Sequence, residues 1–260
     1  MLRKRIIFTL IYENGFFHQS RNFRLQRVGN IRWLERNYKF QSVAFSLDEL
    51  IVLNASKEDK DMQKFAQTLK RLVDNVFIPI AAGGGIRSLE DAKTLFDNGA
   101  DKIVLNSALF QDRELVKALT TKYGSQSVVA SVDYKIVENK RMVFIEDGTL
   151  DTGKELQVYL KDLEGLNVGE LYLNSIDQDG TGFGYDTNVV EELFTSLKAP
   201  LIIAGGAGNE KHLLEGLKIE SVSAVATANL FNFMGDGLPN ARKKILAEDI
   251  NLASFVNKSL

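Results

Sequence analysis

The sequence predicts a single α/β domain folded as a (βα)₈ TIM barrel. Three observations carry this prediction: the chain length, the alternation of strand-like with helix-like segments, and an internal repeat. The chain has 260 residues, and barrels of this class typically have about 250. Apolar residues make up 45% and charged residues 25% of the chain, which is an ordinary globular composition.

Short β-rich runs alternate with longer segments of helical period. In 61–73, for example, Met62, Phe65, Leu69 and Leu72 recur at helical spacing, and 88–98 has a similar pattern. Strand–helix alternation predicts a parallel sheet, and eight such units predict a closed barrel. The predicted strands are 5–11, 48–54, 77–82, 102–106, 127–133, 170–174, 200–204 and 222–227.

Three separated segments repeat at one constant offset. Segments 79–85 and 200–206 match, and so do 48–50 and 169–171, and 108–110 and 229–231. Gly85 and Gly206, Glu49 and Glu170, and Phe110 and Phe231 are each 121 positions apart. A constant offset decides the architecture: it predicts one domain over 1–260, with (βα)₄ half-barrels near 1–122 and 123–240 and a tail at 241–260.

Charge and residue usage exclude several classes of function. The net charge of −2, with both signs spread along the chain, gives no basis for binding nucleic acid or an acidic membrane. No apolar run approaches the roughly 18 residues of a membrane span, and the apolar start is predicted to be a buried strand rather than a signal peptide. A cytoplasmic protein is therefore expected.

The chemistry of metal and thiol sites is also restricted. The chain has no cysteine, which excludes disulfides, thiolate metal sites and cysteine nucleophiles. Its two histidines, His18 in a polar loop and His212 in a helical segment, are predicted to lie on the surface. We expect no metal and no cofactor.

Glycine-rich and polar turns follow the predicted strands of both halves. In barrels of this class, ligands bind at the carboxyl ends of the strands. Glycine lets the backbone approach a ligand closely, and free N–H groups bind anions. The turns at 83–85, 106–108, 205–208 and 228–229 therefore predict one phosphate-binding cradle in each half, although glycines can also serve only to make tight turns. Two cradles indicate a ligand with a phosphate at each end.

At this level of detail the sequence resembles the cyclase subunit family of imidazole glycerol phosphate synthase, histidine-biosynthesis barrels that receive ammonia from a glutaminase. The resemblance covers nearly the whole chain. It is carried by segments 2–7, 48–50, 83–90, 99–102, 123–129, 169–170, 175–181, 184–186 and 205–208. It implies a heterodimer with a glutaminase subunit and a phosphorylated small-molecule substrate.

The resemblance also implies roles for particular residues. It assigns one phosphate to Gly85, Asn106 and Ser107, and the other to Gly180, Gly206, Ala228 and Asn229. Asp133 matches one of two catalytic aspartates, which would act as general acid or base. Asp179 matches a further active-site carboxylate. Without the resemblance, Asp133 could equally cap a following helix.

Several positions depart from the family pattern. The second catalytic aspartate is expected at the end of the first strand, where this chain has Ile11, which cannot transfer a proton. Glu13 lies two residues further on, in a predicted loop, and is a candidate substitute. Gln19 stands where the mobile loop that follows carries a substrate-binding lysine. Asn174 and Ala204 replace hydroxyl residues at their strand ends.

The opposite end of the barrel keeps the family pattern. The resemblance implies that Arg5, Glu49, Lys102 and Glu170 form a charged ring around an entrance for ammonia. Opposite charges in a ring can pair, and the alternative role of such a ring is to stabilise the bottom face. Asp101 is expected to face a docked partner.

Three hypotheses follow. The first is a diverged, ammonia-accepting subunit of a glutamine amidotransferase complex, which resembles paralogues found with O-antigen and other surface-polysaccharide genes and serves sugar amidination. The second is a cyclase of histidine biosynthesis, a lyase that works despite Ile11. The third is a catalytically silent barrel that binds a phosphosugar.

Overall fold

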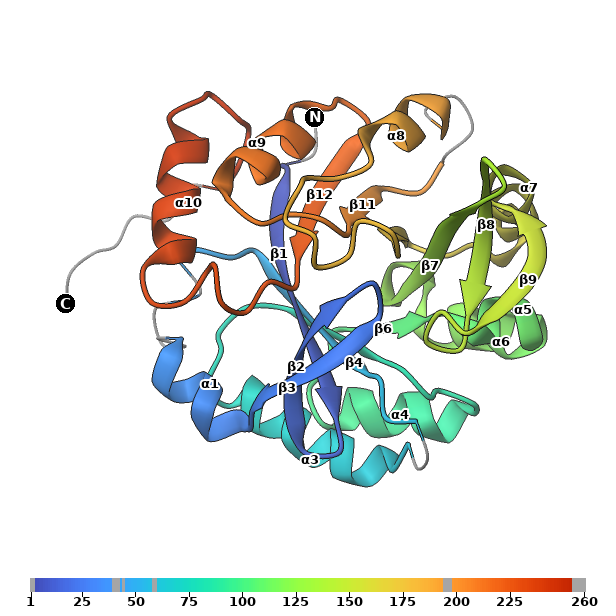
Figure 1. Ribbon diagram of the computed structural model, residues 1–260. Helices are drawn as coiled ribbons and strands as arrows, with labels where there is room; N and C mark the ends of the chain where they lie inside the picture. The colour runs from blue at the N-terminus through green and yellow to red at the C-terminus, as the bar shows by residue number, and fades with distance from the viewer. Residues whose placement is uncertain (1–2, 39–42, 44, 58–59, 194–197, 254–260) are drawn as a thin grey trace.

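The computed structural model describes residues 3–38, 43, 45–57, 60–193 and 198–253. Eight parallel strands close into a barrel, with helices on its outside (Figure 1), which confirms the predicted fold class. In chain order the barrel strands are β1 (Arg5–Glu13), β4 (Glu49–Asn54), β5 (Ile80–Gly83), β6 (Lys102–Leu105), β7 (Val128–Val137), β10 (Glu170–Ser175), β11 (Leu201–Ala204) and β12 (Val222–Thr227). Each pairs with the next, and β12 pairs with β1.

The helices bury one apolar face against the barrel. In α3 the buried residues Met62, Phe65, Leu69 and Leu72 follow the helical period, and the Asp61 side chain caps the first turn by accepting a hydrogen bond from Lys64 N. The helices are α1 (Ile31–Asn37), α3 (Met62–Val73), α4 (Leu89–Asp97), α5 (Ser107–Gln111), α6 (Arg113–Tyr123), α7 (Leu156–Leu163), α8 (Thr187–Leu193), α9 (Glu210–Lys218) and α10 (Gly237–Leu246). The short 3₁₀ turn η1 (Ser125–Ser127) precedes β7, and a second one, η2 (Glu164–Leu166), follows α7.

Residues paired by the repeat occupy equivalent places. Glu49 is the first residue of β4 and Glu170 the first residue of β10. Gly85 and Gly206 each lie two residues beyond a barrel strand, with φ of 82° and 106°. These equivalences are what a duplicated half-barrel would produce.

Two hairpins extend the barrel beyond the predicted strands. The hairpin β2 (Phe16–Arg21) and β3 (Arg24–Gly29) follows β1, and β8 (Lys140–Ile145) and β9 (Leu150–Glu155) follow β7. Asn14 and Gly15 both have positive φ and turn the chain from β1 into β2. The expectation of an irregular loop after the first strand was therefore wrong, and Glu13 lies in β1. Asp133 lies inside β7, and no helix follows for it to cap.

The barrel interior is apolar between its two polar ends. Its buried residues are mostly small or β-branched, as in other barrels of this class: Ile7, Ile51, Ala81, Val104, Val129, Tyr172, Ile202, Ala204, Ala224 and Ala226. A larger core lies between the strands and the helices. Among the described residues, no helix is both long and apolar enough to cross a membrane.

Candidate functional site

A cavity of about 510 Å³ opens at the carboxyl ends of the barrel strands. Its lining brings together the two predicted carboxylates and the seven predicted phosphate-binding residues. These are Asp133 and Asp179, the first-half residues Gly85, Asn106 and Ser107, and the second-half residues Gly180, Gly206, Ala228 and Asn229. One cavity thus contains both predicted cradles and both predicted carboxylates.

Asp133 is buried in the lining of this cavity. Asn106 Nδ2 donates to its Oδ2 atom at 3.0 Å, and Asn174 Nδ2 donates to its Oδ1 atom at 3.2 Å. Burial raises the pKa of Asp133 to about 7, although the hydrogen bonds from the two amides favour the charged form. A carboxyl group with this pKa can accept or donate a proton near neutral pH.

Asp179 also lines the cavity and is engaged by the β2–β3 hairpin. Its Oδ2 atom accepts from Ser20 Oγ at 2.5 Å and from Phe23 N at 3.1 Å. Burial raises its pKa, and these two hydrogen bonds lower it only in part. In this conformation Asp179 holds the hairpin.

The departures from the family pattern have different consequences. Ile11 lines the cavity, so an apolar side chain occupies the place of the expected carboxylate. Glu13 is not part of the described lining, and its Oε2 atom lies 3.2 Å from Nε2 of His18. Gln19 lines the cavity, but its Oε1 atom accepts from Leu230 N at 2.8 Å.

The histidines differ from the sequence prediction. His18 lies in β2 and is only 6% exposed, so the expectation of a surface histidine in a polar loop was wrong. It is buried because β2 folds back against β1, where His18 pairs with Ile11. His212 lies in α9, and its Nδ1 atom accepts a hydrogen bond from Gly208 N at 3.2 Å.

The two cradles share a backbone conformation. Gly84 and Gly85 have φ of 93° and 82°, and Gly205 and Gly206 have φ of 89° and 106°, a region that favours glycine. Contact distances give a second reason for glycine at the second site. A Cβ at Gly206 would lie 1.9 Å from the carbonyl oxygen of Gly184.

The first cradle contains charged residues that sequence reasoning missed. Lys57, Lys60 and Arg87 line the cavity on this side, together with Glu146 and Asp147 from the β8–β9 turn. No motif in the sequence pairs these segments. Of these charged residues, only the lysines in the segment after β4 carried a sequence signal for anion binding.

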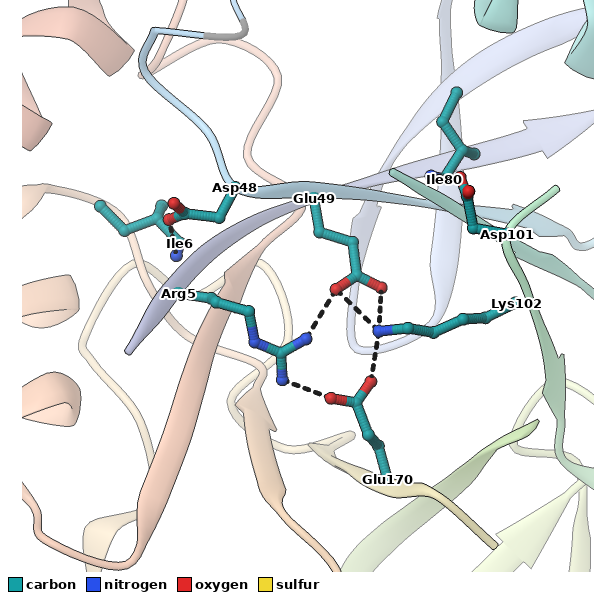
Figure 2. Close-up of polar contacts among 8 residues, drawn as sticks. All are labelled: Arg5, Ile6, Asp48, Glu49, Ile80, Asp101, Lys102 and Glu170. Atoms are coloured by element: carbon teal, nitrogen blue, oxygen red, sulfur yellow. Dashed lines mark hydrogen bonds and ion pairs between the residues drawn. The ribbon is translucent and has the colours of Figure 1, made fainter. Parts of the chain in front are cut away.

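The predicted ring at the bottom of the barrel is closed by ion pairs (Figure 2). Arg5 contacts Glu49 at 2.7 Å and Glu170 at 2.5 Å. Lys102 contacts the same two carboxylates at 3.0 Å and 2.8 Å. Two positive and two negative side chains thus alternate around the barrel axis and compensate one another.

Burial and charge act against each other in the ring. Glu49 is 2% exposed, and its burial raises its pKa while Lys102 and Arg5 lower it. Removing one member would leave buried charge uncompensated, which costs about 3–5 kcal/mol in comparable buried pairs. The ring is therefore stable only as a complete set.

The surface around the ring is shaped by strand starts. Asp101 is exposed, and its Oδ2 atom also accepts from Ile80 N at 2.8 Å, so it fixes the start of β5 (Figure 2). Asp48 does the same for β1 through Ile6 N at 2.7 Å. Phe77, three residues before β5, is 76% exposed on this face.

Comparisons with known proteins agree with this architecture. A family model described as "Histidine biosynthesis protein" matches residues 31–235. The chain is 48% identical over 244 residues to a protein of Parasynechococcus marenigrum (strain WH8102), provisionally named imidazole glycerol phosphate synthase subunit hisF2. That match covers 94% of this chain and 91% of the relative.

Relatives with lower identity are named imidazole glycerol phosphate synthase subunit HisF without reservation. Imidazole glycerol phosphate synthase subunit HisF of Chlorobium phaeobacteroides (strain DSM 266 / SMG 266 / 2430) is 35% identical over 244 residues, 94% of this chain and 96% of its own length. The Sulfurisphaera tokodaii (strain DSM 16993 / JCM 10545 / NBRC 100140 / 7) subunit HisF is 32% identical over 253 residues, 97% and 99% of the two chains. The chain belongs to the histidine biosynthesis protein family and, within it, to the HisF family.

Proposed function

We propose that this chain is the ammonia-accepting subunit of a glutamine amidotransferase complex and that its own cyclase activity is weak. The observation that carries the proposal is the contrast between a complete charged ring at the bottom and an incomplete carboxylate pair at the top. Arg5, Glu49, Lys102 and Glu170 contact one another as a closed ring. Asp133 faces a cavity in which Ile11 replaces the expected second acid.

Glutamine hydrolysis belongs to a partner. In complexes of this class the hydrolysis uses a nucleophile, usually cysteine, and this chain has no cysteine. Ammonia released on a glutaminase would enter through the ring and reach the cavity along the apolar interior. Thr9 and Tyr172, whose hydroxyl oxygens lie 3.2 Å apart, form a polar floor beneath the cavity.

The top of the barrel would bind a phosphorylated substrate. Gly85, Asn106 and Ser107 form one cradle, while Gly180, Gly206, Ala228 and Asn229 form the other. Asp133 would move a proton to or from the substrate, which the raised pKa of its carboxyl allows at neutral pH.

We place the physiological reaction outside histidine synthesis, in the amidination of a sugar for a surface polysaccharide. A role outside histidine synthesis is supported by the loss of the acid at Ile11 and by the higher identity to a hisF2 protein, 48%, than to the HisF subunits at 35% and 32%. The polysaccharide assignment rests on the resemblance of the sequence to paralogues found with such genes. Complementation of a strain that lacks the cyclase tests this assignment. Growth without histidine would overturn it.

Binding to a purified glutaminase subunit of imidazole glycerol phosphate synthase tests the docking face. We expect Lys102→Glu and Phe77→Ser each to raise the Kd at least about tenfold. Phe77→Ser removes an exposed aromatic side chain of the kind that dominates interfaces, and Lys102→Glu puts a third carboxylate into the ring beneath the docked partner. Asp101→Asn removes the charge but keeps an acceptor for Ile80 N, so it isolates the contribution of the charge.

The matched control is Phe183→Ser. Phe183 is 84% exposed in the loop after β10, at the opposite end of the barrel, and its replacement is expected to leave the Kd unchanged. Circular dichroism of each variant checks the fold. An unchanged Kd in the Lys102, Asp101 and Phe77 variants would exclude this face as the glutaminase site.

A further inference from the structure

The two hairpins cover the two cradles crosswise. The β2–β3 hairpin leaves the first barrel strand and reaches the second cradle, where Gln19 Oε1 accepts from Leu230 N at 2.8 Å. The β8–β9 hairpin leaves the fifth barrel strand and reaches the first cradle, where Glu146 N donates to Ser107 Oγ at 3.2 Å. Each half of the barrel thus covers the cradle of the other half.

The tips of the two hairpins meet above the cavity. A Cβ added at Gly148, in the β8–β9 turn, would lie 2.6 Å from Cδ2 of Phe23, in the β2–β3 turn. The turn 146–148 has positive φ at all three residues, which fixes its tight curvature. The two turns therefore meet at the cavity, which Phe23, Glu146 and Asp147 line.

The first cover is held by charge. Lys60 Nζ lies 3.5 Å from Asp147 Oδ2, and Gln111 Nε2 donates to Glu146 Oε1 at 2.8 Å. The stem of Lys60 covers Gly85, because a Cβ added there would lie 2.8 Å from Lys60 Cδ. The ammonium group of Lys60 therefore lies at the first cradle, with a carboxylate of the covering turn as its partner.

The second cover brings no lysine or arginine to its cradle among the described lining residues, and hydrogen bonds hold it. The amide oxygen of Gln19 accepts a hydrogen bond from the N–H group of Leu230, and the backbone oxygen of Ser20 packs against Gly180. Among the described residues that line the cavity, the lysine and arginine side chains are Lys57, Lys60 and Arg87, all from the first half. The electrostatic attraction for an anion is therefore concentrated at one end of the cavity.

We propose that Lys60 is the phosphate-binding side chain of the first cradle. Asp147 pairs with Lys60 until a phosphate takes the place of the Asp147 carboxylate. A phosphate dianion carries more charge than a carboxylate and presents more acceptor oxygens to Lys60 and Lys57. Asp147 then repels the phosphate, so the β8–β9 turn moves away as the ligand enters. One phosphorylated end of a ligand binds first and most tightly at this cradle, and the second cradle takes the other phosphorylated end.

This inference rests on the proposed phosphate binding of the cavity, although not on the glutaminase partner. Inorganic phosphate is the probe, titrated at constant ionic strength and followed through the amide NMR signals of Gly85 and Ser107 at the first cradle and Gly206 and Leu230 at the second. We expect the first pair of signals to saturate at a phosphate concentration at least about threefold lower than the second.

Two variants that break the same ion pair separate binding from structure. Lys60→Met is expected to weaken phosphate binding at the first cradle about tenfold, because it removes a charge-assisted hydrogen bond. Asp147→Asn is expected to strengthen it about threefold, because it removes a competing anion. Lys93→Met, on the outer helix α4 and paired with Asp97, is the control and should leave both Kd values unchanged.

The outcomes are distinct. If the Lys60 and Asp147 variants change the Kd in the same direction, the pair is only structural and the inference is wrong. If the two cradles bind phosphate equally, the inferred order of binding is wrong. If neither cradle binds phosphate, the proposed substrate class fails along with the inference, whereas glutaminase binding is measured separately and can stand alone.

Discussion

The bottom and the top of the barrel hold buried charge in different ways. At the bottom, Arg5 and Lys102 each contact both Glu49 and Glu170, and the four charges sum to zero. At the top, two neutral amides hold the carboxyl group of Asp133, and its pKa rises to about 7. The bottom keeps its charges by pairing them, whereas the top keeps a group that can change its charge.

This difference separates entrance from chemistry. Groups locked in mutual ion pairs are poor proton-transfer catalysts, because their charged forms are stabilised on both sides of the pair. A buried carboxyl group with a raised pKa suits proton transfer. The replacement at Ile11 therefore affects the reacting end of the barrel and leaves the entrance intact, which is the pattern expected of a subunit that still accepts ammonia.

The largest expected effect comes from restoring the missing acid. With the bisphosphate substrate of the cyclase and ammonium salts supplied directly, the unaltered chain should form imidazole glycerol phosphate far more slowly than about 1 s⁻¹. A positioned acid or base contributes roughly 10²–10⁴-fold. Ile11→Asp should recover part of that factor, but not all of it, because Gln19 still stands in place of a lysine.

The isosteric control is Ile11→Asn, which adds polarity without a titratable proton and should give no recovery. Both variants place a polar group at an apolar position, so their free energies of unfolding should fall by similar amounts. Turnover by the unaltered chain at about 1 s⁻¹ or faster would contradict the loss of function at the top, and Asp179 would be the first residue to test as the substitute acid.

Strand positions and strand-end residues could be predicted from the sequence, because alternation and the constant offset depend only on local pattern and spacing. The hairpins were missed although Asn14-Gly15 is a strong hairpin signal. Strands β3 and β9 are largely exposed, so they lack the buried apolar residues that marked the barrel strands.

The site was predictable in part for a related reason. The glycine turns lie at strand ends, Asp133 lies in β7 beside Asn174 of β10, and the fold alone brings these together. The pair of Lys60 and Asp147 joins positions 87 residues apart through a turn whose path follows from its own backbone conformation. The contact of Glu13 with His18 could not be predicted either, because it depends on how β2 folds back on β1.

The second-largest expected effect is a pH dependence of the unfolding free energy that comes from Asp133. The folded-state pKa of its carboxyl is about 7, above the unfolded value of about 3.9. Between these values the folded state binds more protons than the unfolded state, so the free energy of unfolding falls as the pH rises. The slope from this one group approaches about 1.4 kcal/mol per pH unit and vanishes above about pH 7.

Asp133→Asn keeps the size and polarity of the side chain and removes this proton. Denaturant unfolding of both proteins from pH 4 to pH 8 isolates the contribution of Asp133, because the other carboxyl groups are common to both. The stability of the unaltered chain should fall relative to the variant as the pH rises toward 7. If the two plots of unfolding free energy against pH run parallel, Asp133 is ionised from pH 4 to pH 8, as the ion-paired carboxylates of the bottom ring are expected to be.

The smallest effect concerns how firmly the top is covered. The bottom is closed by four ion pairs, whereas Gln19 contributes a single neutral hydrogen bond to Leu230 N in the cover of the second cradle. Removing such a bond costs about 1 kcal/mol, so Gln19→Ala should raise the hydrogen-exchange rate of the Leu230 amide about fivefold. Global stability should stay nearly unchanged, because the hairpin opens locally.

Gln111→Ala is the matched control for this prediction. It removes an amide that holds the other cover through Glu146 at 2.8 Å, so it should leave the protection of Leu230 unchanged. Unaltered exchange at Leu230 in the Gln19 variant would mean that Ser20 and Asn22, which contact Asp179, hold the hairpin without it. The second cradle would then be closed by Asp179, and Ser20→Ala would be the variant that opens it.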